Sequence, residues 1–164
     1  MQKTISIFTD GSSLGNPGRG GYGAVLIFHD KKTVQEIGGA EKNTTNNRME
    51  MRAVIEALKQ APADSSIKVY SDSAYVLQGI TTWLSGWIRR NWRTSTNTPV
   101  LNEDLWKELA SISAEHSVEW IKVKGHAGSA GNERCDEIAR TCAAGEKVDF
   151  FSGSLSDYES MYGN

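Results

Sequence analysis

The amino-acid sequence predicts an α/β fold, in which three antiparallel strands and then alternating helices and strands form a mixed five-stranded sheet flanked by helices. Two observations predict it. Near the start of the chain, apolar and polar side chains alternate with the period of two that is typical of strands. Further along, apolar residues recur with the helical period, and short apolar runs separate these stretches. Antiparallel strands followed by strand and helix units are typical of a mixed sheet covered by helices.

Three strands are expected to open the chain as a meander. Residues 4–9 alternate, much of 21–28 does so too, and 34–40 can return as the third strand. The polar residues 29–32 suit the turn between the second and third strands. The sequence therefore predicts three neighbouring antiparallel strands.

Helices and two further strands follow the meander. Thr44 or Thr45 can cap the first helix, and Pro62 stops it. The apolar residues of this helix fall on one face, namely Met51, Val54, Ala57 and Leu58. The later elements are expected to be a buried strand over 67–71, a helix from about Ser73, a helix after the cap Asn102, a strand over 118–123 and a helix from near Asn132.

Length and composition indicate one domain. The chain has 164 residues, of which 38% are hydrophobic, and this is enough for a single core. We assign residues 1–145 to that domain. Residues 146–164 are rich in Ser, Gly and Asp and show no periodicity, so we expect them to form a loosely attached or disordered tail.

Net charge argues against a generic nucleic-acid binder. The formal net charge is −2 and the pI is about 5.9, so any nucleic-acid contact is expected to be local. The stretch 84–101 is a candidate, because it carries three arginines and no acidic residue, interleaved with tryptophans. The residues concerned are Arg89, Arg90, Arg93, Trp87 and Trp92. A solvated face is the alternative reading of such a run.

The sequence favours a reducing compartment. Residues 1–8 contain neither a long apolar stretch nor a cleavage site, which leads us to expect a cytoplasmic protein without membrane contact. If Cys135 and Cys142 lie on one helix, their Cα atoms are roughly 10 Å apart and beyond disulfide reach. Two free thiols suit a reducing environment. No exposed apolar stripe points beyond a monomer.

Four carboxylates occur at corresponding positions of the predicted elements. Asp10 is expected to end the first strand and Asp72 the fourth, while Glu50 lies about one turn into the first helix and Asp136 lies similarly in the last. Carboxylates gathered at neighbouring strand ends repel each other unless a cation intervenes. The absence of a Cys/His ligand pattern favours Mg²⁺ or Mn²⁺. Taken singly, each carboxylate is more simply read as a turn former or a helix cap.

His126 lies in a glycine-rich segment, where it can accept a proton from an attacking water or deliver one to a leaving oxygen. An exposed loop histidine is an equally favoured reading.

Six short motifs occur in one register over roughly the first nine tenths of the chain: TDGS at 9–12, GNPG at 15–18, NNRME at 46–50, SDS at 71–73, VKGHAG at 123–128 and NERCD at 132–136. Together they resemble the bacterial type of ribonuclease HI. The resemblance implies a ribonuclease H-like fold and an endonuclease that hydrolyses the RNA strand of RNA/DNA hybrids. It further implies two bound Mg²⁺ ions, for which Mn²⁺ can substitute, and products with 5′-phosphate and 3′-hydroxyl ends.

The same resemblance implies roles for individual residues. Asp10, Glu50, Asp72 and Asp136 correspond to the metal-binding catalytic carboxylates, and His126 to a residue that assists proton transfer or product release. The implied substrate contacts come from Asn16, Asn46, Asn47, Asn132, Thr45 in a pocket for a DNA phosphate, Trp83 in the DNA channel, and Arg89, Arg90 and Arg93 in a basic protrusion. Neutral amides suit this work, because they can read the minor groove and the ribose 2′-OH.

Structural roles compete with several of these assignments. Asn46 lies near the start of a helix, where capping the helix is the favoured reading. Trp106 also aligns with a tryptophan of the family, but we expect it to pack in the core. The sequence also departs from the family in a protrusion that is poorer in basic residues and in Ala74, which lacks the polar side chain common there. Weaker binding to the hybrid is therefore expected.

Two other functions remain open at this point. One is a related nuclease or polynucleotidyl transferase acting on DNA, which the short chain and the asparagine set disfavour. The other is a hybrid-binding module without catalysis, which the presence of all four carboxylates disfavours.

Overall fold

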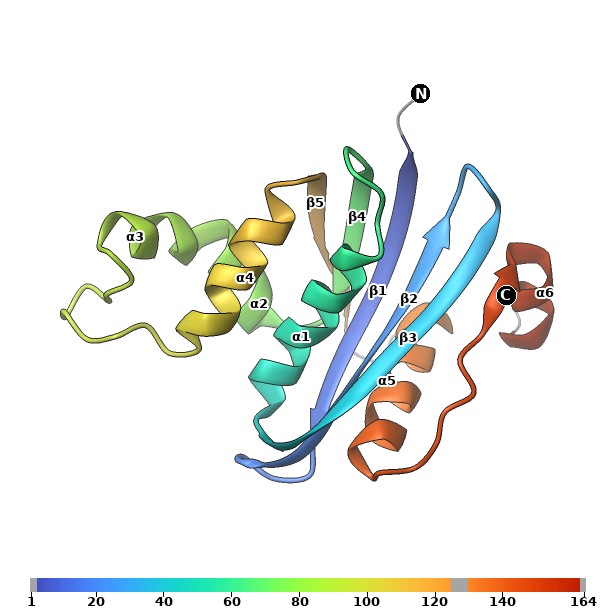
Figure 1. Cartoon of the computed structure of the whole chain (residues 1–164), viewed down its shortest axis with the longest axis horizontal. Coiled ribbons are helices and arrows are strands. Elements are labelled where there is room, and N and C mark those ends of the chain that lie inside the picture. Colours follow the sequence, from blue (N-terminus) through green and yellow to red (C-terminus); the bar gives the residue numbers. More distant parts are fainter. Residues whose placement is uncertain (1–2, 125–129, 163–164) are drawn as a thin grey trace.

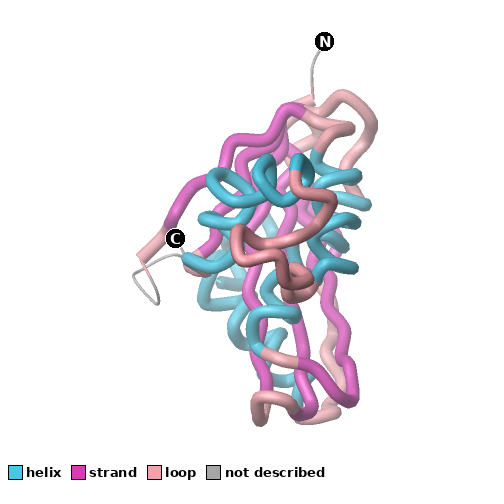
Figure 2. Tube along the Cα trace, turned by 90° about the vertical axis from the view of Figure 1, so that its left-hand side faces the viewer, coloured by secondary structure: helices cyan, strands magenta, loops and turns pink. Residues whose placement is uncertain are grey.

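The computed structural model describes residues 3–124 and 130–162 and shows a six-stranded mixed sheet with helices on both faces (Figures 1 and 2). The order of strands across the sheet is β5-β4-β1-β2-β3-β6. The strands are β1 (Thr4–Ser13), β2 (Gly18–Phe28), β3 (Thr33–Thr44), β4 (Ser66–Ser71), β5 (Ser117–Lys122) and β6 (Ser152–Ser154). The helical elements are α1 (Asn46–Lys59), α2 (Ala74–Gln78), η1 (Gly79–Trp83), α3 (Leu84–Arg89), α4 (Glu103–Ser113), α5 (Ala130–Ala143) and α6 (Leu155–Tyr162).

The predicted meander is confirmed, and its strands are longer than the sequence indicated. β1 pairs antiparallel with β2, and β2 with β3. The additional residues, such as those of 10–13 and 18–20, are mostly small or polar, so no alternation of apolar side chains marks them. The two predicted parallel strands are confirmed as well, since β4 pairs with β1 and β5 with β4.

Two core clusters occupy opposite faces of the sheet. Ile5 and Ile7 of β1 belong to the larger one, which α1 and α4 cover, whereas Phe8 packs against the smaller cluster around Cys135 of α5. This division follows from the alternation of side chains along a strand. Trp106 is fully buried in the larger cluster, which confirms its expected core role.

Close packing of α5 on the sheet depends on small residues in β2. A Cβ atom on Gly23 would lie 2.8 Å from the Cys135 carbonyl oxygen, and one on Gly21 would meet the backbone of α5. Cys135 and Cys142 both lie on α5, as predicted, and are free and buried. Within residues 3–124 and 130–162, no helix is long and apolar enough to cross a membrane.

The helix expected from about Ser73 is interrupted. Ser73 caps α2 by accepting a hydrogen bond from the Val76 amide at 3.1 Å, but the chain then widens into the π-helical turn η1 before α3 begins. The ring of Trp106 packs against Gly79, where even a Cβ atom would collide with it. Such wide turns arise where packing inserts a group against the helix backbone.

The expectations of five strands and of a loose tail were wrong. β6 pairs with Thr33–Gln35 of β3, and α6 follows it directly. Tyr158 of α6 is only 6% exposed and donates a hydrogen bond to Glu36 of β3 at 2.9 Å. The segment is held by strand pairing, by single polar contacts and by a few side chains such as Phe151 and Leu155 that pack on the smaller core cluster, and together these produce no regular apolar period.

Candidate active site

Three of the four predicted carboxylates meet at one point. Asp10, Glu50 and Asp72 each offer an oxygen atom, and these atoms all lie within 4.8 Å of one another. They come from β1, from α1 and from the residue that follows β4. The sequence predicted this meeting from the positions of the three residues in their elements.

Strand pairing brings Asp10 and Asp72 together. β1 and β4 run parallel, with Phe8 opposite Tyr70, and the same offset carried two residues further sets Asp10 opposite Asp72. The sequence suggested that Asp10 ends its strand, but β1 continues to Ser13. β4 does stop at Ser71, so the carboxylate of Asp72 follows the end of its strand.

Glu50 reaches the cluster because α1 approaches the backbone of β1 at a glycine. A Cβ atom on Gly11 would collide with the backbone nitrogen of Glu50 and with the carbonyl carbon of Met49. Only glycine leaves room for this approach. Gly11 also donates its amide hydrogen to Asp10 Oδ1 at 2.9 Å, which orients that carboxylate.

Burial and the repulsion between carboxylates make Asp10 and Glu50 hard to ionise. The pKa of Asp10 is raised from 3.8 to about 7, chiefly by burial and next by the charge of Asp72. Burial, followed by the charges of Asp10 and Asp72, raises the pKa of Glu50 well above its usual value of 4.5. Glu50 Oε2 is buried and has no hydrogen-bond partner among the described residues. A hard divalent cation fits this set of oxygen ligands, because it would neutralise the charges and bind Glu50 Oε2.

Asp136 lies near this cluster but outside the group of three. Its carboxylate accepts a hydrogen bond from Arg140 Nε at 2.9 Å within α5. The charge of Asp136 also raises the pKa of Asp10, by less than burial or the charge of Asp72 does. The predicted proton-transfer residue, His126, lies outside the described residues.

Four of the predicted substrate-binding residues line one hollow of about 410 Å³, which also includes Leu101 and Asn102. They are Asn16, Thr45, Asn46 and Asn47. Thr45, not Asn46, caps α1, because Thr45 Oγ1 accepts a hydrogen bond from the Arg48 amide at 3.2 Å. Asn46 instead donates its backbone amide to Asn16 Oδ1 at 3.0 Å. Asn132 lies apart from this set, in the first turn of α5.

Asn102 also lines this hollow, whereas the sequence alone indicated for it only the role of a helix cap. It precedes α4 in the left-handed conformation, with φ of 61°, and its side chain makes no capping hydrogen bond. Its amide nitrogen donates to the Tyr75 hydroxyl at 3.0 Å, and its amide oxygen accepts from Arg48 Nη1 at 3.2 Å. The only sequence signal was an asparagine before a helix, since asparagine tolerates a positive φ.

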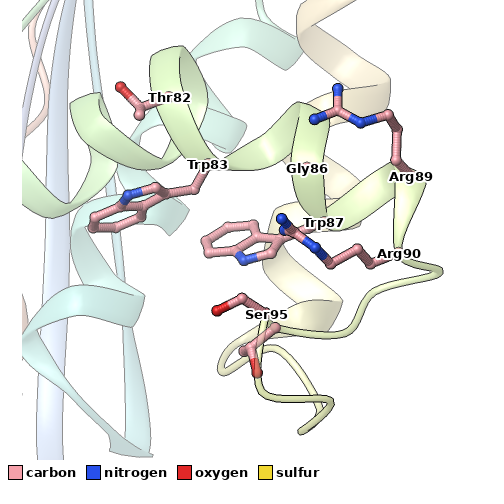
Figure 3. Close-up of a pocket in the computed structure, with 8 residues that line it drawn as sticks. Thr82, Trp83, Gly86, Trp87, Arg89, Arg90 and Ser95 are labelled. Carbon is pink, nitrogen blue, oxygen red and sulfur yellow. The ribbon is translucent and has the colours of Figure 1, made fainter.

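The basic stretch forms a second hollow of about 490 Å³ beside α3 (Figure 3). Trp83, Trp87, Arg89 and Arg90 line it together with Thr82, Gly86, Thr94 and Ser95. The rings of Trp83 and Trp87 lie side by side, with 5.8 Å between their centroids, and Figure 3 shows the Arg89 side chain leaving α3 in another direction from that of Arg90. Arg93 lies outside the lining and donates a hydrogen bond to the Asn97 carbonyl at 3.2 Å.

Known proteins resemble this chain in sequence and in fold. The RNase H family model matches residues 2–144. The Ribonuclease H of Aeromonas salmonicida is 51% identical over 148 residues, which cover 90% of this chain and 95% of that protein. The crystal structure of LC9-RNase H1, described as a type 1 RNase H with the type 2 active-site motif, aligns with a TM-score of 0.82 and 29% identity over 98% of this chain and 82% of that one. LC11-RNase H1, solved in complex with an RNA/DNA hybrid, shares the fold with a TM-score of 0.63 and 24% identity over 86% of this chain and 97% of that one.

Proposed function

The chain belongs to the RNase H family, and we propose that it is an endonuclease that hydrolyses the RNA strand of RNA/DNA hybrids. The observation that carries the proposal is the group of three carboxylates, in which Asp10 and Glu50 are buried and Asp72 is half-buried, and Glu50 Oε2 has no hydrogen-bond partner within residues 3–124 and 130–162. Buried like charges of this kind are costly unless they serve a bound cation. Phosphoryl transfer with divalent ions needs such a site.

Mg²⁺ is the proposed cofactor, with Mn²⁺ as a substitute, and two ions would be held by Asp10, Glu50, Asp72 and Asp136. Bound there, the ions would supply a nucleophilic hydroxide at neutral pH and neutralise charge on the phosphate, leaving 5′-phosphate and 3′-hydroxyl ends. The glycine amide on Asp10 Oδ1 keeps that ligand in a fixed orientation. Asp136 is held by Arg140 at the edge of the group and would complete the ligand set. His126 would move a proton at the attacking or leaving oxygen.

Substrate recognition is proposed for the two hollows. Asn16, Asn46 and Asn47 present amides that can read the minor groove and the 2′-OH of the RNA strand, and Thr45 would contact a phosphate. Asn132 is proposed to contact the substrate from α5. In the second hollow, Trp83 with its 37% exposed side chain would face the DNA strand.

Arginines beside the second hollow would give the local positive charge that a protein of net charge −2 needs for nucleic acid. Arg89 and Arg90 would contact phosphates from the lining, and Arg93 from the following loop. The protein is proposed to act as a monomer. We also propose that it acts in the cytoplasm, because the two free, buried thiols suit a reducing compartment.

A strand-cleavage assay tests the function. Labelled RNA/DNA, RNA/RNA and DNA/DNA duplexes are incubated with the protein over a titration of Mg²⁺, and only the RNA of the hybrid is expected to shorten. Cleavage of a DNA strand would favour the DNA-acting enzyme instead, and binding without cleavage would favour a silent hybrid-binding module. Asp10→Asn is expected to abolish cleavage while the folded protein still binds the hybrid. Undiminished Mg²⁺-dependent cleavage by that variant would refute the site.

A further inference from the structure

The C-terminal segment, residues 146–162, folds back onto the helix that carries Asp136. The chain leaves α5 through Gly145 at a φ of 79° and returns along the sheet to β6 and α6 (Figure 1). Phe151 of this segment makes one backbone hydrogen bond to β3, in which its carbonyl oxygen accepts from the Glu36 amide at 2.8 Å. The segment therefore lies beside both β3 and α5.

Glu36 joins three separate parts of the chain through one buried carboxylate. Its side chain is fully buried and accepts hydrogen bonds from Arg134 Nε at 2.8 Å and Nη2 at 3.0 Å. It also accepts from the Phe151 amide at 2.9 Å and from the Tyr158 hydroxyl at 2.9 Å. A buried carboxylate with four donors is a rigid junction, since moving any one element breaks a charge-assisted hydrogen bond.

Arg134 is the residue of α5 that bonds to Glu36, and it also contacts the C-terminal segment. Its guanidinium also donates to the Asp149 carbonyl at 3.4 Å and lies over the Tyr162 ring, 5.3 Å from its centroid. Arg134 stands two residues before Asp136, and two residues turn a helix through about 200°. The side chain of Arg134 therefore leaves α5 on one side of the helix, and that of Asp136 leaves it on roughly the opposite side.

We infer that Glu36, Arg134 and Tyr158 are positioning residues, through which the C-terminal segment fixes the rotation of α5 and hence the approach of Asp136 to Asp10. The inference rests on the proposed function. A side-chain tip about 6 Å from the helix axis moves by about 1 Å for a rotation of about 10°. A displacement of about 1 Å at a catalytic group can cost about a hundredfold in rate. The segment thus supports metal binding from outside the carboxylate group.

Two substitutions test the junction. Glu36→Gln removes the charge that holds Arg134, and Tyr158→Phe removes one donor while keeping the ring, which makes it the milder change. Binding of Mn²⁺ alone is measured by electron paramagnetic resonance of the free ion, at a temperature where each variant is shown to be folded. We expect the Mn²⁺ dissociation constant to rise about tenfold in Glu36→Gln, which is the lower end of the effect of groups that orient metal ligands, and to rise by less in Tyr158→Phe.

Two controls separate positioning from general destabilisation. Leu109→Ala removes a buried side chain of α4 in the other core cluster and should leave the Mn²⁺ dissociation constant unchanged. In an Asp136→Asn background, Glu36→Gln should produce no further loss of Mn²⁺ affinity, because the residue through which it acts is already changed.

The possible results are distinct. Unchanged Mn²⁺ affinity in both junction variants, an equal loss in Leu109→Ala, or a loss in Glu36→Gln that persists in the Asp136→Asn background would each overturn the inference. The Mn²⁺ measurement requires no cleavage, so it decides the inference by itself. A wild-type protein that binds Mn²⁺ but cleaves no hybrid would refute the proposed function alone.

Discussion

Replacing Asp10 by asparagine is expected to stabilise the metal-free protein in a way that depends on pH. The pKa of Asp10 is about 7 in the folded protein and 3.8 in the unfolded chain, because burial and the charge of Asp72 disfavour its ionised form. At about 1.36 kcal/mol for each pKa unit, this difference corresponds to roughly 4 kcal/mol at full ionisation. The asparagine variant carries no such cost.

The sign of the effect follows from proton linkage. The folded protein binds the proton of Asp10 more tightly than the unfolded chain does, so the destabilisation is absent below pH 3.8. It grows as the pH rises and is complete above about pH 7. The stability advantage of Asp10→Asn over the wild type should therefore increase by roughly 2–3 kcal/mol between pH 5 and pH 8.

Urea denaturation in the presence of a chelator, at pH 5 and at pH 8, measures this advantage. Asp30→Asn, in an exposed turn, serves as the matched control and should show no such increase. Mg²⁺ at about a hundred times its dissociation constant should stabilise the wild type by about 2.7 kcal/mol, and Asp10→Asn by much less. An advantage of Asp10→Asn that is equal at both pH values would refute the reasoning from burial and repulsion.

Further predictions concern other parts of the site. Gly11→Ala should displace α1 and lower the rate of hybrid cleavage about a hundredfold or more, since a Cβ atom there collides with the helix backbone; a steady-state rate within a factor of three of the wild type would contradict this. Glu36→Gln should lower the free energy of unfolding by about 3 kcal/mol at pH 7, because it leaves a guanidinium without its buried partner. The pKa of Glu36 is lowered in the folded protein, so this loss should shrink as the pH falls below the usual value of 4.5, and urea denaturation from pH 3 to 7 follows it. The double change Arg89→Ala with Arg90→Ala should weaken hybrid binding and make its salt dependence shallower by about two counterions, whereas Lys31→Ala, in the turn before β3, should leave the slope unchanged.

Much of the fold was predictable because periodicity is a local property. The alternation in 4–9 and the helical stripe from Met51 to Leu58 show which side of each segment is buried, whatever the rest of the chain does. The positions of Asp10 and Asp72 relative to their strands were also enough to predict their meeting, because adjacent parallel strands bring such residues to one edge.

Contacts between distant segments were not predictable in the same way. The sixth strand pairs with residues of β3 more than a hundred positions away, and Tyr158 is buried against Val34 and bonded to Glu36, contacts that leave no pattern in the sequence around them. The turn that interrupts the helix after Gln78 lies against the ring of Trp106, and Asn102 donates a hydrogen bond to the hydroxyl of Tyr75, both of them contacts between residues far apart in the sequence.

The sequence by itself determined the secondary structure of the main body, the fold class and the carboxylates that gather at one edge of the sheet. The tertiary structure decided that Gly11 leaves room for Glu50 to approach Asp10, that Glu36 accepts hydrogen bonds from Arg134 and Tyr158, and that the C-terminal segment contacts α5. The physical reason is that repeated burial shapes a whole segment and is visible along it. A hydrogen bond or a close backbone approach joins two single residues, and only their meeting in space reveals it.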